Sequence, residues 1–203
     1  MKTARVCAIT YDWYPLDPTV CRLSQAAIDA GYEVDVICLR QSHEKPFEVC
    51  DGVRTYRLPM NRGFGGSLPA TTLSWCWFML LAAFTVTRLH LRRAYDVIHV
   101  HNMPDFLVFS ALIPKLLGAK VILEVQDVCP ELMAAKASGR LAPFVKYLAQ
   151  LQERISTVFA DHVITVGWPF EEALVKRGVP AAKVTTILNS ADPRIFPPSR
   201  RPS

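Results

Sequence analysis

The chain has 203 residues, of which 51% are hydrophobic and 20% charged. This length suits one domain with a sizeable core, and the apolar fraction excludes an intrinsically disordered chain. The net charge of +5 is scattered, and no basic run alternates with aromatic residues. We therefore expect no nucleic acid partner; anionic substrates or an acidic membrane surface fit better.

The six cysteines are dispersed without CxxC or CxxxH spacing, at Cys7, Cys21, Cys38, Cys50, Cys76 and Cys129. This pattern indicates neither a disulfide framework nor a zinc site, and a reducing cytosol is the simplest setting. The first eleven residues lead straight into a strand and contain no apolar segment or cleavage site typical of a signal peptide. A cytoplasmic location is expected.

Short apolar strands alternate with helices along the chain. The pattern predicts strands at 5–11, 33–39, 53–58, 96–100, 121–125, 162–166 and 184–188. It predicts helices from Asp17-Pro18 to Gly31, and at 70–92, 104–117, 143–160 and 169–177. Such alternation is typical of βαβ units with right-handed crossovers. The fold class expected is therefore α/β, a Rossmann-like doubly wound domain with a mostly parallel sheet of about seven strands.

The helix at 143–160 carries large apolar residues at helical spacing, which predicts that they form its buried face. These residues are Phe144, Tyr147, Leu148, Leu151, Ile155, Val158 and Phe159.

Ligands of such sheets lie outside the carboxyl ends of the strands. The turn after the first strand, residues 12–18, contains no glycine that would let a pyrophosphate approach the backbone, so a nicotinamide dehydrogenase is not expected. The chain also lacks a Walker loop and a G-x-S-x-G elbow, which argues against P-loop NTPases and α/β-hydrolases.

Three ordered segments carry a family resemblance. They are Tyr95–Asn102 with Pro104-Asp105, Ala119–Asp127 with Pro130-Glu131, and Ala160–Val166 leading to Asn189–Asp192 and Phe196. In this order and spacing the chain resembles the N-terminal, acceptor-side domain of glycosyltransferase family 4, which has the two-domain GT-B fold.

The resemblance implies a reaction and a division of labour. Family members transfer a sugar from a nucleotide-sugar to an acceptor hydroxyl with retention of configuration and no obligatory metal. The nucleotide-sugar donor sits mostly on a C-terminal domain, so no cofactor is expected on this half. We expect residues 1–192 to form the acceptor-side domain, residues 193–203 to be a Pro/Arg-rich linker or tail, and the C-terminal donor-binding domain to be absent. The chain alone is then expected to be inactive unless a donor-binding domain or chain joins it.

The resemblance also points to site residues. His101 and Asn102 close a strand at the cleft edge, where acceptor or donor contact competes with simple strand capping. Asp105, Asp127 and Glu131 are placed to bind sugar hydroxyls, with structural capping as the alternative.

Two positions depart from the family pattern, and both lie in expected site loops. Gln126 stands where many relatives have histidine; glutamine exchanges hydrogen bonds but carries no charge, so catalysis is expected to be weakened or lost. In the first loop a closer-looking subgroup of relatives has Asp-Pro-Arg-Val-x-Arg, and this chain keeps Arg22 but has Thr19 in place of the first arginine. Arg22 is then expected either to contact a phosphate or to be a solvated helix charge. Asn189 belongs to the expected substrate-binding set.

His99 and His101 lie two residues apart on one strand face. With no third ligand apparent in the sequence, a metal site is not expected, and His99 is interpreted as a hydrogen-bonded core histidine.

Residues 63–87 contain no charged side chain, and arginines follow at 88, 92 and 93. The segment sits between strands of one sheet, so burial against the sheet is favoured over spanning a membrane. The alternative is a helix, Leu73 to Arg93, lying on an anionic leaflet, which suits a sugar or lipid-linked acceptor and a peripheral position at the inner membrane face.

Two function classes stay open. One is the acceptor-binding half of a glycosyltransferase. The other is a non-catalytic binding or scaffolding remnant of the family, which the departures at Gln126 and in the first loop would suit.

Overall fold

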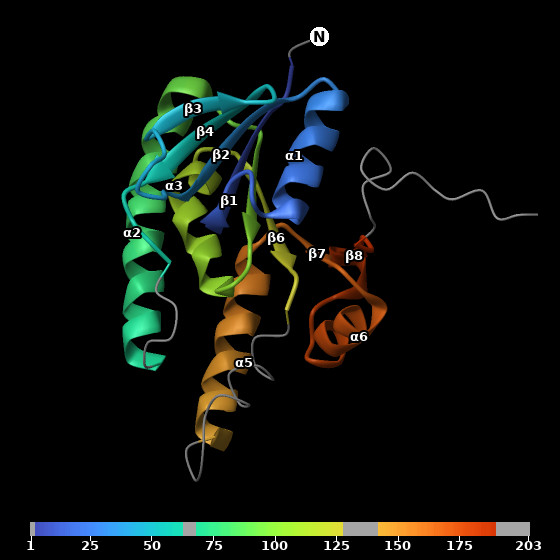
Figure 1. The fold of residues 1–203 in the computed structure, drawn as a ribbon. Helices are drawn as coiled ribbons and strands as arrows, with labels where there is room; N and C mark the ends of the chain where they lie inside the picture. The colour runs from blue at the N-terminus through green and yellow to red at the C-terminus, as the bar shows by residue number, and fades with distance from the viewer. Residues whose placement is uncertain (1–2, 63–67, 128–141, 190–203) are drawn as a thin grey trace, which may run out of the picture.

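The computed structural model describes residues 3–62, 68–127 and 142–189 (Figure 1). Its centre is an eight-stranded sheet in the order β3-β4-β2-β1-β5-β6-β7-β8. The strands are β1 (Arg5–Trp13), β2 (Glu33–Leu39), β3 (Phe47–Cys50), β4 (Val53–Leu58), β5 (Val97–His101), β6 (Lys120–Val125), β7 (His162–Thr165) and β8 (Val184–Thr186). All neighbours pair in parallel except β3 and β4. The α/β doubly wound, mostly parallel sheet is confirmed.

The expected count of seven strands was one short, because β3 was missed. Asp51 and Gly52 have φ of 49° and 83°, as a two-residue hairpin turn requires, and they join β3 to β4 in antiparallel register. β3 has only four residues and is largely exposed, so it lacks the apolar run by which the other strands were identified.

Helices cover both faces of the sheet (Figure 1). They are α1 (Pro18–Asp29), α2 (Leu68–Arg93), the 3-10 helix η1 (Asp105–Ala111), α3 (Leu112–Leu116), α5 (Ala142–Phe159), α6 (Trp168–Lys176) and the 3-10 helix η3 (Ala181–Lys183). Val20 of α1 belongs to a small core on one face, whereas Phe78 of α2, Leu107 of η1 and Leu174 of α6 share the larger core.

Local signals explain where α1 begins and ends. The Asp17 carboxylate accepts hydrogen bonds from the backbone N–H of Thr19 and Val20, and Pro18 occupies the first turn. Gly31, at φ +86°, ends the helix as predicted. The single helix predicted at 104–117 is instead η1 followed by the short α3, so its first half is wound more tightly than expected.

Helix α2 packs one stripe against the sheet and exposes the rest. The buried stripe is Trp75, Phe78, Ala82, Val86 and Leu89. On the outer side Leu73, Trp77, Leu80, Phe84 and Leu91 are each more than half exposed. By length and composition Pro69–Arg93 would suffice to cross a membrane, a test that core helices also pass. Because α2 joins β4 to β5 of one sheet, a span would separate paired strands.

Helix α5 is inverted relative to the sequence-based prediction. Phe144, Tyr147, Leu148, Leu151, Ile155 and Val158 are all 42–72% exposed, and Phe159 alone of the predicted face is partly buried against the core. The buried side instead carries Ala149, Glu153, Ser156 and Thr157. Glu153 is accommodated by an ion pair with Arg177 at 2.7 Å, and Thr157 donates to backbone oxygens of its own helix. The small buried residues Ala149, Ser156 and Thr157 allow α5 to pack closely against η1, while the large apolar residues of α5 face outward.

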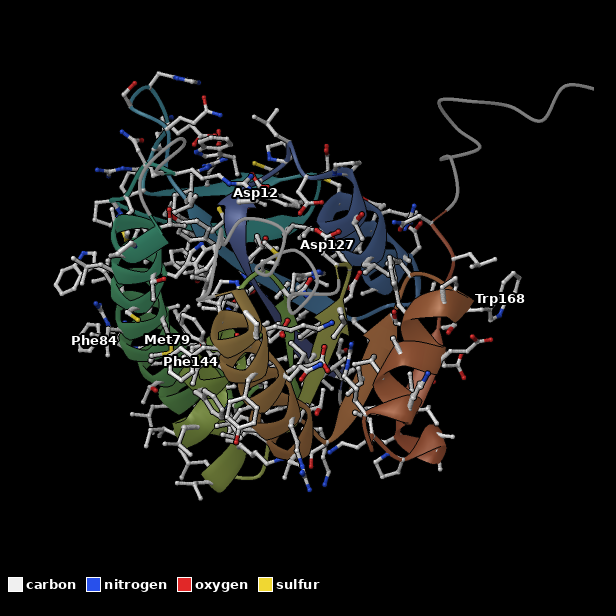
Figure 2. The ribbon with its side chains drawn as sticks, turned by 90° about the horizontal axis from the view of Figure 1, so that it is seen from below. Asp12, Met79, Phe84, Asp127, Phe144 and Trp168 are labelled. Atoms are coloured by element: carbon white, nitrogen blue, oxygen red, sulfur yellow. The ribbon has the colours of Figure 1, made fainter. Side chains whose placement is uncertain are left out.

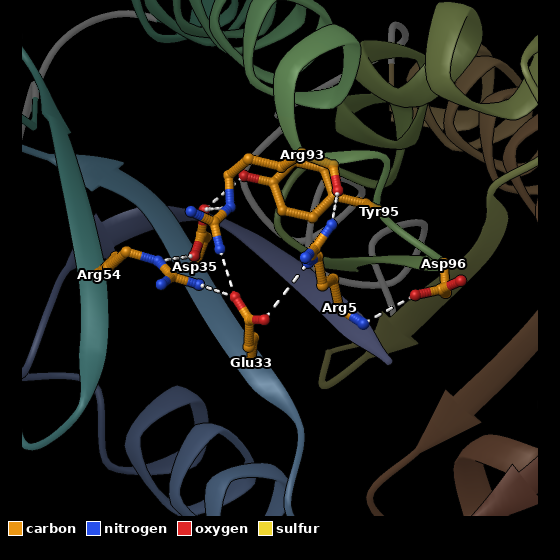
Figure 3. Close-up of polar contacts among 7 residues, drawn as sticks. All are labelled: Arg5, Glu33, Asp35, Arg54, Arg93, Tyr95 and Asp96. Atoms are coloured by element: carbon orange, nitrogen blue, oxygen red, sulfur yellow. Dashed lines mark hydrogen bonds and ion pairs between the residues drawn. The ribbon is translucent and has the colours of Figure 1, made fainter. Parts of the chain in front are cut away.

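An ion-pair network fastens the amino-terminal edge of the sheet (Figure 3). Asp35 on β2, whose side chain is 1% exposed, accepts hydrogen bonds from Arg54 at 2.7 Å and Tyr95 at 2.5 Å and lies 3.1 Å from Arg93. Glu33 contacts the guanidinium groups of Arg5, Arg54 and Arg93. These contacts hold β1, β2, β4 and the end of α2 together at the amino-terminal edge. The carboxyl edge, where ligands of parallel sheets lie, is at the opposite end of the strands.

Candidate functional site at the carboxyl edge of the sheet

The carboxyl ends of the parallel strands meet at one edge, which Figure 2 views directly. Asp12 near the end of β1 and Asp127 beyond the end of β6 lie at this edge (Figure 2). Asp12 forms an ion pair with Arg62, which follows β4. The pair links two loops of the edge and was not anticipated from the sequence, since the two residues are 50 positions apart.

Asn102 is the centre of a polar cluster formed by the loops after β5 and β6. Its Nδ2 donates to Oδ1 of Asp105 and to the backbone oxygen of Asp127, both at 2.9 Å. Its Oδ1 accepts from the backbone N–H of Gln126, also at 2.9 Å. The structure therefore brings together four of the predicted site residues: Asn102, Asp105, Gln126 and Asp127.

The carboxylates of this cluster differ in exposure. Asp105 is buried, with 1% of its surface exposed, and starts η1, whereas Asp127 is exposed. An exposed carboxylate whose backbone is held at the carboxyl edge of the sheet is suited to accept hydrogen bonds from hydroxyl groups. Asp105 acts as a support that orients Asn102.

The side chain of Gln126 turns back toward the sheet. Its Nε2 donates to Oε1 of Glu124 at 3.3 Å, and it is only partly exposed. A neutral amide held this way can donate or accept a hydrogen bond but cannot carry a charge.

Glu124 was missed by the sequence analysis, and it joins His99 and His101. Its Oε2 lies 3.0 Å from Nε2 of His99 and 3.0 Å from Nδ1 of His101. Burial favours a raised pKa for Glu124, but contact with both imidazoles holds its pKa well below the ordinary range. Burial lowers the pKa of His99, and the neighbouring His101 lowers it further, while Glu124 opposes both. The available signal was a carboxylate inside an otherwise apolar strand, which is stable only with a partner.

The predicted residues Arg22 and Asn189 meet each other. Nη2 of Arg22 donates to Oδ1 of Asn189 at 2.7 Å, with Asn189 exposed and Arg22 partly buried. Glu131 and the proposed boundary at residue 192 lie outside the described residues, as does Cys129.

Known proteins and solved structures show which family this chain resembles. Residues 16–190 match the family described as the glycosyl transferase 4-like domain. None of the curated proteins matches the chain in sequence. Among solved structures, sucrose-phosphate synthase from Thermosynechococcus elongatus is similar over 95% of this chain and 49% of its own, with a TM-score of 0.66 and 18% identity.

Two further structures show the same fold. A glycosyltransferase from Rickettsia africae ESF-5 is covered over 47% of its length by the whole of this chain, with a TM-score of 0.57 and 9% identity. Os79 from O. sativa, solved in complex with UDP, is similar over 98% of this chain and 55% of its own, with a TM-score of 0.62 and 15% identity. The chain thus spans about half the length of GT-B glycosyltransferases that share its fold.

Proposed function

The chain belongs to the family of glycosyl transferase 4-like domains, and we propose that it forms the acceptor-side half of a retaining glycosyltransferase. In this proposal a donor-binding domain or chain supplies the nucleotide-sugar, and this half binds the acceptor hydroxyl compound. The observation that carries the proposal is the Asn102 cluster, which gathers predicted site residues at the carboxyl edge where ligands of parallel sheets lie.

The division of labour has a physical basis. Transfer needs positive dipoles or donors near the departing diphosphate and polar groups around an oxocarbenium-like sugar. The described edge offers carboxylate and amide groups that suit hydroxyls, and Arg22 as a cationic group for phosphate. A single wall of a cleft cannot surround both parts of the donor. We therefore propose that the 203-residue chain alone does not transfer sugar.

We further propose a lipid-linked acceptor, because α2, α3 and α5 each expose large apolar side chains. These exposed residues are named here the outer apolar face: Leu73, Trp77, Leu80, Phe84 and Leu91 of α2, Leu112, Ile113 and Leu116 of α3, and Phe144, Tyr147, Leu148, Leu151, Ile155 and Val158 of α5. α2 and α5 both contact η1, which continues into α3. Phe84 and Leu91 of α2 and Ile113 of α3 line one shallow hollow, and Phe84 points away from the protein body (Figure 2). A group of large apolar side chains exposed on neighbouring helices marks an interaction site in soluble proteins.

The charges around the outer apolar face favour an anionic lipid surface as its partner. Arg88, Arg92, Lys146 and Arg154 are exposed on these helices. Within the described parts of α2, α3 and α5 the one acidic residue is Glu153, which is buried against Arg177. Cations without competing surface carboxylates attract anionic headgroups, while Trp77 and Phe84 suit the headgroup boundary. A peripheral position at the cytoplasmic membrane face is part of the proposal.

The function is tested by joining the chain to the donor-binding domain of a family member and following transfer from labelled nucleotide-sugars to polyprenyl-phosphate-linked acceptors. Asn102→Ala is expected to reduce transfer strongly in the joined protein, because it releases the backbone of Gln126 and Asp127. Asn61→Ala, at an exposed loop position, is the matched control. Turnover by the isolated chain above a blank would contradict its proposed dependence on a partner.

A non-catalytic binding module of the same family is the second candidate, favoured by the engagement of Gln126 with Glu124. The substitution Gln126→His distinguishes the transferase from the binding module. In a joined protein shown to bind donor, restoring a titratable group should raise the rate by about 10²–10⁴-fold if the position faces the reacting sugar. Acceptor binding with no transfer in either form would favour the binding module.

A further inference from the structure

We propose that His99, His101 and Glu124 form a binding site for a divalent transition-metal ion, with zinc as the best fit. This site goes beyond the proposed sugar transfer and does not depend on it. The sequence shows the two histidines but not the third ligand, which β6 supplies.

The strands place the three side chains together. His99 and His101 lie on the same face of β5 because side chains alternate along a strand, and their rings stack with centroids 4.4 Å apart. His101 pairs in register with Glu124 of β6, so the two side chains stand next to each other on that face. The three ligand atoms lie within 4.8 Å of one another.

The two separations from Glu124 fit ligands that share one ion, and the two histidine nitrogens, within 4.8 Å of each other, would have to move closer to bind it. Oε2 of Glu124 is 3.0 Å from a ring nitrogen of each histidine. Ligand atoms about 2.0–2.1 Å from one zinc ion stand about 3.0–3.4 Å apart. These separations alone would also fit two hydrogen bonds. However, Nε2 of His99, Nδ1 of His101 and Oε2 of Glu124 are buried and have no partner of hydrogen-bond geometry. The three buried atoms therefore contact one another only as ion pairs, and a shared cation would give each of them a direct partner.

The donor set selects the class of metal. Two imidazoles and a carboxylate suit zinc and neighbouring transition metals, whereas magnesium and calcium prefer oxygen ligands throughout. Metal binding needs neutral histidine and ionised glutamate. Access is available from the side of His99, whose side chain is 12% exposed, while His101 and Glu124 are at most 2% exposed.

The site has an outer partner that connects it to the candidate sugar site. Gln126 donates to Oε1 of Glu124, the oxygen that does not face the histidines. A hydrogen bond from a residue outside the ligand set, such as this one, orients a carboxylate that binds a metal. A bound ion would therefore hold Glu124, and through it Gln126, in a fixed orientation at the carboxyl edge.

The test uses the full 203-residue chain, freed of metal with a chelator, and cobalt(II) as a spectroscopic probe. We expect one equivalent of cobalt to give the visible d–d bands of low-coordinate nitrogen–oxygen ligation, and zinc to displace it. Zinc at about 100-fold above its Kd should raise Tm by about 5–10 °C, and magnesium should not. His99→Gln, His101→Gln and Glu124→Gln should each weaken cobalt binding by more than the about 10–100-fold typical of losing an outer partner. His43→Gln, at an exposed loop position, should leave it unchanged.

Three outcomes would overturn the site. The first is a wild-type chain that shows no d–d bands and no zinc-dependent rise in Tm; this measurement requires no variant to fold. The second is a sulfur-to-cobalt charge-transfer band, which would assign the metal to cysteine; the five cysteines in the described residues are free thiols. The third is a folded Glu124→Gln protein that binds cobalt as tightly as the wild type.

Discussion

Arg22 of α1 and Asn189 beyond β8 are joined by a 2.7 Å hydrogen bond although they lie 167 residues apart in sequence. α1 contacts β1 and β2, whereas β8 is the last strand on the other side of the sheet order. The contact therefore joins α1 to the segment that follows β8 and fixes the position of the Arg22 guanidinium group.

Replacing Arg22 should affect ligand binding more than folding. Hydrogen bonds to charged groups are typically worth about 1.5–3 kcal/mol, so Arg22→Gln should weaken pyrophosphate binding by about 10- to 100-fold. Because the pair is not deeply buried, the free energy of unfolding should change by less than about 1 kcal/mol. Pyrophosphate titration followed by NMR measures the first effect and urea unfolding the second. Lys176→Gln on α6 is the charge-matched control, and an equal loss of affinity there would show that only net charge matters.

Removing the buried carboxylate of the amino-terminal network should strongly destabilise the fold. Asp35→Ala leaves Arg54, Arg93 and Tyr95 without their shared acceptor (Figure 3). Loss of one partner of a buried ion pair costs about 3–5 kcal/mol. Urea unfolding measures this difference, and Glu172→Gln at an exposed position of α6 should change stability by less than about 0.5 kcal/mol. A loss no larger for Asp35→Ala than for that control would rule out the network as a source of stability.

The same network predicts acid sensitivity. Hydrogen bonding from Arg54, aided by Arg5, lowers the pKa of Glu33 despite partial burial. A carboxyl group with a lowered folded pKa contributes stability above its unfolded pKa, near about 4.3, and loses that contribution as pH falls through the folded pKa. Glu33→Gln should therefore be less stable than the wild type at pH 6, and the difference should shrink below about pH 4. Unfolding curves from pH 6 to pH 2.5 test this; a constant difference at every pH would contradict it.

The outer apolar face predicts salt-sensitive membrane association. Flotation with anionic and neutral liposomes should show preferential binding to the anionic ones, released by high salt. Arg88→Gln and Arg92→Gln should each weaken anionic binding by about fivefold, since one basic residue near such a surface contributes about 1 kcal/mol. Trp77→Ser and Phe84→Ser should weaken binding to every liposome.

The controls for flotation lie on α6, away from the outer apolar face. Trp168 is 64% exposed there and offers a matched tryptophan, Trp168→Ser, while Lys176→Gln matches the charge changes. Equal binding to neutral and anionic liposomes would show that electrostatic attraction does not contribute to membrane binding. An effect of Trp168→Ser as large as that of Trp77→Ser would show that the face is not specific.

Most of the sheet and the edge that holds the candidate site could be predicted from the sequence. Apolar runs identify the seven longer or more buried strands, and Asp17, Pro18 and Gly31 mark α1 through local chemistry. The orientation of α5 could not be predicted, because periodicity shows that a helix has an apolar side but not what that side contacts. Glu124 was missed for a related reason: its partners His99 and His101 are on another strand, and only the register brings them together.

The hairpin β3–β4 also determines how the sheet ends. Without β3, the edge of β4 would offer unpaired backbone N–H and C=O groups to another chain. β3 covers that edge, and its Glu48 accepts from Arg57 of β4 at 3.0 Å, which anchors the short strand to a nearly buried cation. With four residues, β3 gives a foreign strand little length to pair with, and at the other end β8 has only three. Within the described residues, the fold therefore protects both ends of a large, mostly parallel sheet against edge-to-edge aggregation by keeping its outermost strands short.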